Sequence, residues 1–190
     1  MAAHAGGHSL SQYEPYRHLD ELAAAIIETP ALAAILGNSY DISPDILVVR
    51  QPIGQRELSD SGIVVDGVAS YSPLLAHNQS SAIIHAVVSC KWTLRSDRAQ
   101  NARSEALNLI RNRKGRTPHI VVVTGEPTPS RLSSLALGTG DIDTVYHFAL
   151  PELIAATQAS GNEEAIKTLD TLVTGQRLRD IADLPLDLAI

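Results

Sequence analysis

The sequence has a single cysteine, Cys90, among its 190 residues. No disulfide bond can therefore form within the chain, which is consistent with a reducing compartment. No apolar run approaches the roughly 20 residues that a membrane-spanning helix needs. Residues 1–12 also lack the basic and apolar blocks of a secretory signal peptide. These absences predict a cytoplasmic protein without a membrane partner.

The composition is that of a folded globular protein. Hydrophobic residues make up 44% of the chain and charged residues 19%, which excludes a disordered protein. A chain of 190 residues is most simply one domain with its own core. Residues 1–12 show no periodicity and are expected to form a flexible arm, whereas residues 13–190 are expected to form the single domain.

The net charge of −6 conceals an uneven distribution. The segment 91–131 has nine Lys and Arg residues against three acidic residues, a balance of +6, so that the rest of the chain sums to −12. A basic segment on an acidic chain is typical of a cleft that binds a polyanion. A solvated helix face rich in arginine would give the same pattern.

Strand and helix patterns alternate along the chain. Apolar runs bounded by proline, glycine or polar residues predict strands at 44–52, 62–67, 81–94, 118–126 and 143–148. Helical spacing predicts helices at 16–29, 95–115 and 129–140, and two more between 151 and 173. This order predicts an α/β or α+β protein in which helices cover a sheet.

The strand at 81–94 carries the residues of greatest chemical interest. Side chains alternate between the two faces of a sheet, and the even positions from Ala82 to Trp92 are all apolar. This pattern predicts that Cys90 points into the core, while Ser89 and Lys91 point into a more polar space. A buried cysteine is not a reactive thiol, so a catalytic role for its side chain is not expected.

A lysine beside the core requires neighbouring anions. Asp45 opens a predicted strand, and Glu105 lies at the border of the apolar stripe of the helix that follows Lys91. We expect the three side chains to share one cleft. Two carboxylates favour Mg²⁺, and Mg²⁺ with a lysine suits phosphodiester hydrolysis. A purely structural ion pair between the lysine and the carboxylates is the alternative.

These residues carry a resemblance to a known family. Pro44-Asp45, Ser89-Cys90-Lys91 and the displaced Glu105 resemble the rearranged PD-(D/E)XK signature of the CCGG-recognising type II restriction endonucleases of the NgoMIV family. The resemblance is co-linear from Pro44 to about Phe148. It implies a restriction-endonuclease-like α/β fold, with a mixed central sheet flanked by helices, and Mg²⁺ as cofactor. It further implies a homo-oligomer, either a dimer or a tetramer, that cleaves double-stranded DNA at a palindrome with a CCGG core, such as GCCGGC.

The resemblance also implies catalytic roles. Asp45 and Glu105 would be metal ligands, together with the backbone carbonyl group of Cys90, and Lys91 would be the catalytic lysine. Ser89 stands where the ordinary motif has its acidic residue, which is why Glu105 supplies the carboxylate from the helix.

Base-reading residues are implied in the same way. Arg95, Asp97 and Arg98 would read the core of the site in the major groove, and Arg131 would read the outer G·C pair. The chemistry fits, because arginine donates to guanine O6 and N7 while aspartate accepts from cytosine N4, with about 1–3 kcal/mol of discrimination for each good pair. Without the resemblance, this run would be a solvated helix start capped by Ser96 or Asp97.

Two other functions remain open. Members of the family carry a longer segment before the PD element, with a further acidic residue, an outer-base aspartate and a minor-groove arm, whereas 44 residues precede Asp45 here. A catalytically impaired DNA-binding or oligomerising remnant of such a nuclease is therefore the first alternative. The second is a small-molecule enzyme with Leu137–Asp141 (LGTGD) as a phosphate loop, although a tight turn explains its two glycines better.

Overall fold

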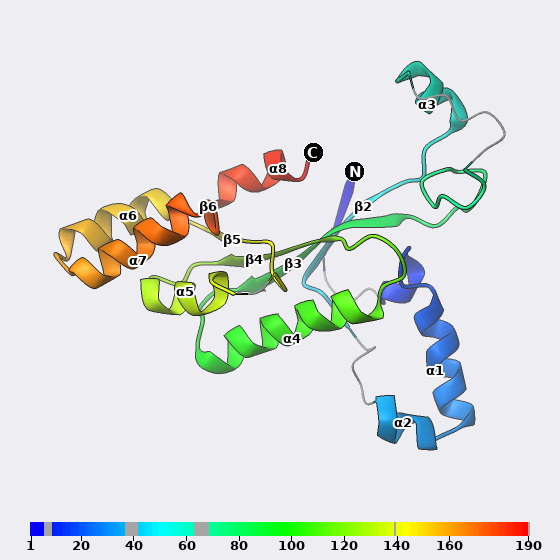
Figure 1. Ribbon diagram of the computed structural model, residues 1–190, viewed down its shortest axis with the longest axis horizontal. Helices are drawn as coiled ribbons and strands as arrows, with labels where there is room; N and C mark the ends of the chain where they lie inside the picture. The colour runs from blue at the N-terminus through cyan, green and yellow to red at the C-terminus, as the bar shows by residue number, and fades with distance from the viewer. Residues whose placement is uncertain (6–8, 37–41, 63–68, 139, 190) are drawn as a thin grey trace.

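One mixed sheet forms the centre of the protein (Figure 1). The computed structural model describes residues 1–5, 9–36, 42–62, 69–138 and 140–189. Within them, six strands lie in chain order: β1 (Ala2–Ala5), β2 (Ile46–Arg50), β3 (Ile83–Lys91), β4 (His119–Thr124), β5 (Thr144–His147) and β6 (Leu178–Asp180). The pairs β1–β2 and β2–β3 are antiparallel, and the strands from β3 to β6 run parallel.

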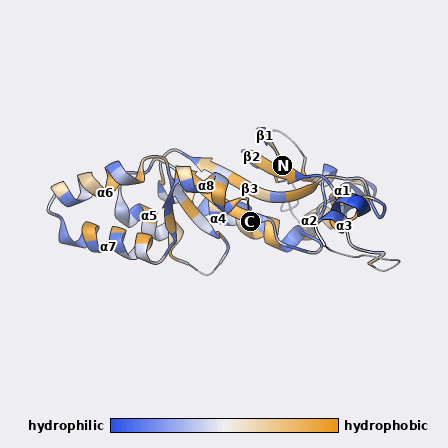
Figure 2. Ribbon diagram, turned by 90° about the horizontal axis from the view of Figure 1, so that it is seen from above, coloured by the Kyte–Doolittle hydropathy of each residue, from blue (hydrophilic) through white to orange (hydrophobic). Residues whose placement is uncertain are grey.

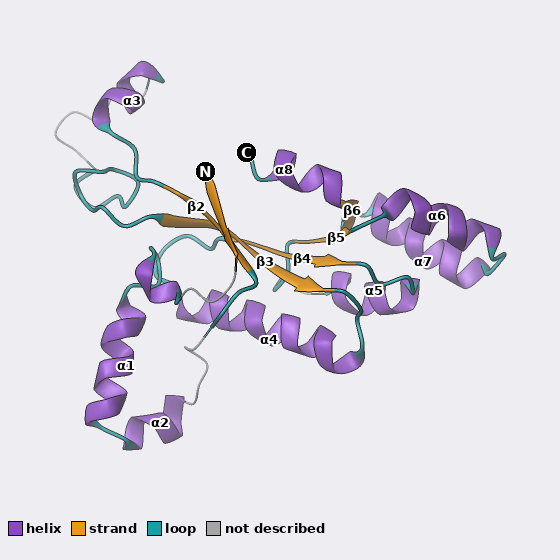
Figure 3. Cartoon of the chain, turned by 180° about the vertical axis from the view of Figure 1, so that it is seen from behind, coloured by secondary structure: helices purple, strands orange, loops and turns teal. Residues whose placement is uncertain are grey.

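Helices flank this sheet, as the predicted fold class requires. They are α1 (His18–Glu28), α2 (Ala31–Leu36), α3 (Gln55–Asp60), α4 (Ser96–Asn112), α5 (Pro129–Ala136), α6 (Leu150–Ala159), α7 (Glu163–Thr174) and α8 (Leu184–Asp187), with 3₁₀ turns η1 (Leu10–Gln12) and η2 (Ile181–Asp183). Figures 1 and 3 show α4 and α5 on one face of the sheet and α8 on the other. None of the helices in the described ranges is long and apolar enough to cross a membrane.

The main core lies between α4 and the sheet. The apolar stripe predicted for this helix is buried, with Ala99, Ala102, Ala106 and Leu109 facing inward. Three alanines in the stripe let the helix lie close to the strands. Figure 2 shows hydrophobic residues concentrated along the strands, while both kinds of residue alternate along α6 and α7. The fully buried Tyr16 anchors the N-terminal segment to α4, because its hydroxyl group donates to the carbonyl oxygen of Leu109 at 2.9 Å.

The side chains of strand β3 do not alternate regularly between the two faces of the sheet. Its pairing with β2 shifts by one residue and leaves His85 as the extra residue of a bulge. As a result Ile84 and Val87 both belong to the main core, although one is even and the other odd in number. Val88 belongs to a small cluster on the opposite face, against η2 and α8.

The prediction that Cys90 points into the core is wrong. Cys90 is exposed, and Trp92 is 68% exposed. The reason is that the short elements η2 and α8 cover this face of β3 near Val88 but leave the end of the strand open. An apolar pattern identifies a face of a strand and does not show whether another element covers it.

The described part of the N-terminal segment contributes a strand and a 3₁₀ turn, while the flexible arm expected over residues 1–12 stays a prediction. Ala2–Ala5 form the edge strand β1, and Leu10 and Ser11 are buried. This strand pairs with the edge of β2 through backbone groups, so that it needs no strand-like pattern of side chains. Residues 63–67 of the strand predicted at 62–67 lie outside the described part of the chain.

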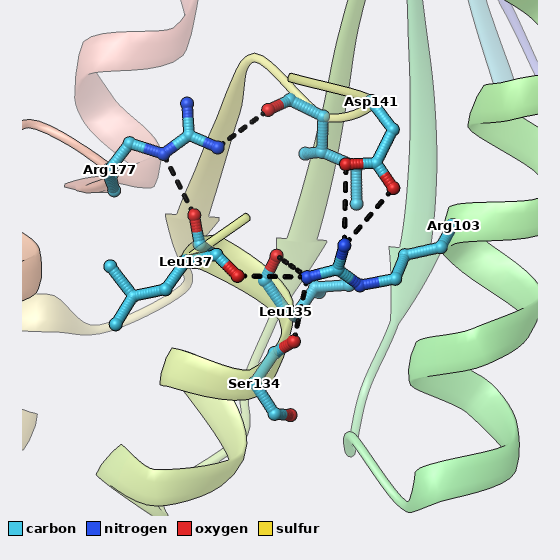
Figure 4. Close-up of polar contacts among 8 residues, drawn as sticks. Arg103, Ser134, Leu135, Leu137, Asp141 and Arg177 are labelled. Atoms are coloured by element: carbon cyan, nitrogen blue, oxygen red, sulfur yellow. Dashed lines mark hydrogen bonds and ion pairs between the residues drawn. The ribbon is translucent and has the colours of Figure 1, made fainter. Parts of the chain in front are cut away.

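Arg103 of α4 holds the loop that follows α5 (Figure 4). One nitrogen of its guanidinium group, Nη1, lies 3.2 Å from the Asp141 carboxylate. The other, Nη2, donates to the carbonyl oxygens of Ser134, Leu135 and Leu137 at 2.9, 3.1 and 3.0 Å. The loop therefore directs carbonyl and carboxylate oxygens at an arginine of the protein itself, an arrangement opposite to that of a phosphate loop.

The two glycines of the loop have structural reasons. A Cβ atom on Gly138 would lie 2.8 Å from the guanidinium nitrogens of Arg103, so that only glycine allows this close approach. Gly140 has a φ of +86°, in the left-handed region that favours glycine. These positions serve the turn and give no support to the phosphate-loop alternative.

Replacing Arg103 by alanine should destabilise the fold. The change leaves the buried Asp141 without its cation and three carbonyl groups without a donor, and we expect a loss of about 2–4 kcal/mol in the free energy of unfolding. Arg111→Ala, an exposed position on the same helix, should change stability by less than about 0.5 kcal/mol. Chemical denaturation measures both variants, and equal small losses would contradict the role assigned to Arg103.

Candidate active site

The predicted catalytic residues meet where β2 begins and β3 ends. Because these strands are antiparallel, with Ile46 paired to Val88, Asp45 lies beside the end of β3. The Oδ2 atom of Asp45 accepts hydrogen bonds from the backbone N–H group of Cys90 at 2.7 Å and from Nζ of Lys91 at 3.3 Å. The first bond fixes the carboxylate, and the second pairs it with the lysine.

Glu105 approaches the same lysine from α4. Its Oε1 atom lies 3.6 Å from Nζ of Lys91, and its Oε2 atom accepts a hydrogen bond from Oγ of Ser89 at 3.1 Å. Ser89 and Lys91 both point toward α4. They lie two and four residues after Val87, which faces the main core, and the bulge does not interrupt the strand between these positions. The structure thus brings together Asp45, Ser89, Lys91 and Glu105, as the sequence predicted.

The three charged side chains of this site differ in their exposure to solvent. The side chain of Lys91 is 18% exposed, whereas those of Asp45 and Glu105 are 44% and 42% exposed. The lysine side chain is therefore largely covered, and the two acidic side chains are more open to solvent. One cation between two anions leaves a formal excess of one negative charge, which suits the binding of a metal cation.

The donor set fits Mg²⁺. Carboxylate oxygens are hard ligands, and Mg²⁺ is usually held by one or two carboxylates, with water and substrate phosphates completing the shell. In the described part of the chain, no group of three or more His, Cys, Asp and Glu residues is placed to hold a metal ion. The predicted contribution of the Cys90 carbonyl group stays a prediction.

The thiol group of Cys90 is unsuited to nucleophilic catalysis. Partial desolvation and the nearby Asp45 carboxylate raise the pKa of this thiol, and the charge of Lys91 only partly opposes them. A thiol is reactive as its thiolate, which a raised pKa disfavours. The raised pKa therefore argues against a catalytic thiol, although the side chain is exposed rather than buried.

The predicted base-reading residues lie at the start of α4. Arg95, Asp97 and Arg98 are all exposed. Arg95 occupies the N-cap position, and no side chain caps the helix, so that neither Ser96 nor Asp97 serves as the cap. Arg98 donates to Oγ1 of Thr93 at 3.3 Å. The exposed run is therefore not explained by helix capping.

Arg131 lies on α5, paired with a residue that the sequence did not reveal. Its Nη1 atom is 3.6 Å from Oε2 of Glu126, and its side chain is 52% exposed. Glu126 is 0% exposed and accepts hydrogen bonds from the backbone N–H groups of Leu94 at 2.8 Å and Thr128 at 3.0 Å. The only sequence signal was an acidic residue directly after a buried strand, at the edge where the loops meet.

The surroundings of Glu126 favour the ionised form of its carboxyl group despite its burial. Burial raises the pKa of its carboxyl group, but the hydrogen bonds from Leu94 and Thr128 and the charge of Arg131 outweigh this effect and lower the pKa overall. A buried anion therefore stands behind a half-exposed cation.

The comparisons with known proteins give the family. The model of the NgoMIV restriction enzyme family matches residues 3–190. This chain belongs to that family. The type II restriction enzyme NgoMIV of Neisseria gonorrhoeae is 57% identical over 182 residues, which cover 95% of this chain and 64% of the relative. The chain thus spans just under two thirds of the length of that relative.

A solved complex of the restriction endonuclease PspGI with substrate DNA is more distant. It is 20% identical to this chain, covers 55% of this chain and 39% of its own, and has a TM-score of 0.36. That similarity is too low to support an argument. The family is confirmed by the sequence match, and the mixed sheet flanked by helices is seen directly.

The basic segment 91–131 does not form one surface in this family member. Arg103 is turned toward the α5 loop, and the Nη1 atom of Arg113 donates to the carbonyl oxygen of Ile110. Lys114 and Arg116 follow the far end of α4, about 25 Å from Arg95 for a helix of this length. Within this segment, the arginines at the start of α4 and Arg131 on α5 remain exposed.

Replacing Ser89 by alanine should loosen Glu105. The hydroxyl group of this buried serine donates to the carboxylate, and its loss should cost about 0.5–1.5 kcal/mol in the free energy of unfolding. Ser104→Ala, at an exposed position of α4, should change stability by less than about 0.5 kcal/mol. If thermal denaturation finds the two variants alike, Ser89 does not hold Glu105.

Proposed function

We propose that this protein is a site-specific endonuclease that hydrolyses phosphodiester bonds of double-stranded DNA, with Mg²⁺, at a palindrome with a CCGG core such as GCCGGC. The observation that carries the proposal is the position of Lys91, whose Nζ atom lies 3.3 Å from Asp45 and 3.6 Å from Glu105. Membership of the NgoMIV restriction enzyme family supports it.

The side chains would divide the reaction between them. Asp45 and Glu105 would hold Mg²⁺, which when bound polarises a phosphoryl oxygen and lowers the pKa of a water molecule. Lys91 has three N–H donors that can orient the attacking water or stabilise the charge that develops on the phosphate. Ser89 keeps Glu105 in position, and the backbone N–H group of Cys90 does the same for Asp45.

Recognition would depend on the exposed start of α4. Arg95 and Arg98 would donate to guanine, and Asp97 would accept from cytosine N4, the two kinds of contact that a C·G-rich core needs. Arg131 would contact the outer G·C pair. A palindrome is read by a two-fold arrangement, so we propose a homo-oligomer, a dimer or a tetramer, of one nuclease domain that includes strand β1.

The proposed activity predicts Mg²⁺-dependent cleavage of plasmid DNA that carries GCCGGC sites. Asp45→Ala or Lys91→Ala should lower the rate by more than about a hundredfold, because each removes a charge from the reacting centre. Asp20→Ala and Lys167→Ala, at exposed positions, are matched controls and should cut normally.

Three further results bear on this proposal. A plasmid without CCGG should remain intact, and chelation of Mg²⁺ should stop the reaction. Specific DNA binding without cutting at any concentration of Mg²⁺ or Mn²⁺ would overturn the nuclease proposal in favour of a catalytically impaired binding protein.

The recognition scheme predicts a loss confined to the specific site. Arg95→Ala or Arg98→Ala should weaken binding to a CCGG duplex by about 1–3 kcal/mol and leave non-specific binding largely unchanged. Fluorescence anisotropy with CCGG and unrelated duplexes measures both quantities, with Arg111→Ala as the matched control. Equal losses on both duplexes would show that these arginines contact phosphates rather than bases.

A further inference from the structure

Glu126 is a buried charge that the proposed reaction does not use. It follows β4 at the same edge of the sheet as Lys91, yet its carboxylate contacts Leu94, Thr128 and Arg131 instead of the catalytic group. A carboxylate with 0% exposure is costly to bury unless its neighbours compensate for the lost water. Its partners therefore indicate what it does.

The two oxygen atoms of this carboxylate contact two different helix starts. Oε2 accepts a hydrogen bond from the backbone N–H group of Leu94, the residue immediately before the N-cap of α4. Oε1 accepts one from the backbone N–H group of Thr128, which is the N-cap residue of α5. One rigid group thus joins the segments that carry the predicted inner and outer base readers.

The backbone of Glu126 is fixed as well. Its N–H group donates to Oγ1 of Thr124 at 3.2 Å, and its carbonyl oxygen lies 3.1 Å from Nε2 of His147. The Nδ1 atom of the same histidine accepts from the N–H group of Ala149 at 3.0 Å, which places the proton of the neutral ring on Nε2, as a donor to Glu126. Neither Thr124 nor His147 is more than 4% exposed, so the carboxylate has little freedom to shift.

Glu126 also orients Arg131 without covering it. The contact of 3.6 Å involves one guanidinium nitrogen, and a guanidinium group has five N–H donors. A side chain that is 52% exposed keeps donors accessible to a DNA base. A pairing of this kind limits the rotamers of a long side chain while leaving its outer edge free.

We propose that Glu126 is a positioning residue that places Arg131 and the start of α4 relative to each other, and thereby sets fidelity at the outer base pair. This inference rests on the proposed function. It assigns to Glu126 no contact with DNA or with the reacting atoms.

The decisive variant is Glu126→Gln, which keeps the shape but removes the charge and one of the two acceptors. Discrimination between GCCGGC and a duplex with a changed outer base pair should fall about tenfold. In the Arg131→Ala background, the same substitution should change this discrimination by less than about threefold, because the residue through which it acts is absent. Relative cleavage rates and binding constants on the two duplexes measure both effects.

Two controls separate positioning from general stability and from the proposed function. Leu19→Ala removes a buried side chain of α1, outside the segments that Glu126 joins, and should lower stability while keeping full discrimination. Hydrogen exchange of the Leu94 and Thr128 amides in the DNA-free protein should be faster in Glu126→Gln, a result that does not depend on any nuclease activity.

Unchanged discrimination in Glu126→Gln, an equal loss in the Arg131→Ala background, or unchanged exchange at both amides would overturn the proposal. If the unaltered protein neither binds nor cuts GCCGGC, the proposed function fails, and the exchange measurement alone decides whether Glu126 holds the two helix starts.

Discussion

The ion pairing of Lys91 is the interaction on which the arrangement of the site depends. A lysine whose side chain is only 18% exposed requires anions close by, and it receives them from two different elements. The antiparallel pairing of β2 with β3 delivers Asp45, and the packing of α4 on the sheet delivers Glu105. A helix with larger residues than alanine in its buried stripe would stand further from the strands and would withdraw one of the two carboxylates.

What could be predicted from the sequence depended on short-range patterns. Helical spacing was sufficient to find α4 and its buried stripe, and the need to neutralise Lys91 was sufficient to bring Asp45 and Glu105 to it. Strict alternation failed along β3, because the bulge at His85 changes which residues share a face. The exposure of Cys90 could not be predicted at all, since it depends on how far the distant C-terminal elements extend over the sheet.

Two other features depend on contacts between remote segments. Ala2–Ala5 have no strand-like pattern and pair with β2 because its edge offers free backbone groups. In the sequence, Glu126 is simply one acidic residue within a basic segment. Its burial follows only once the loops after β3 and β4, which are parallel strands, leave the sheet at the same edge and enclose it.

Two clusters of charged side chains lie at this edge of the sheet, and the sign of the buried charge differs between them. At the predicted reaction site the cation Lys91 lies inside and the carboxylates of Asp45 and Glu105 face solvent, so that the outward field is negative and suits Mg²⁺. At the predicted reading site the anion Glu126 lies inside and the guanidinium group of Arg131 faces solvent, so that the outward field is positive and suits DNA. In both, the buried charge restrains the exposed one, and a flexible side chain that is restrained before binding loses less conformational entropy when its ligand arrives.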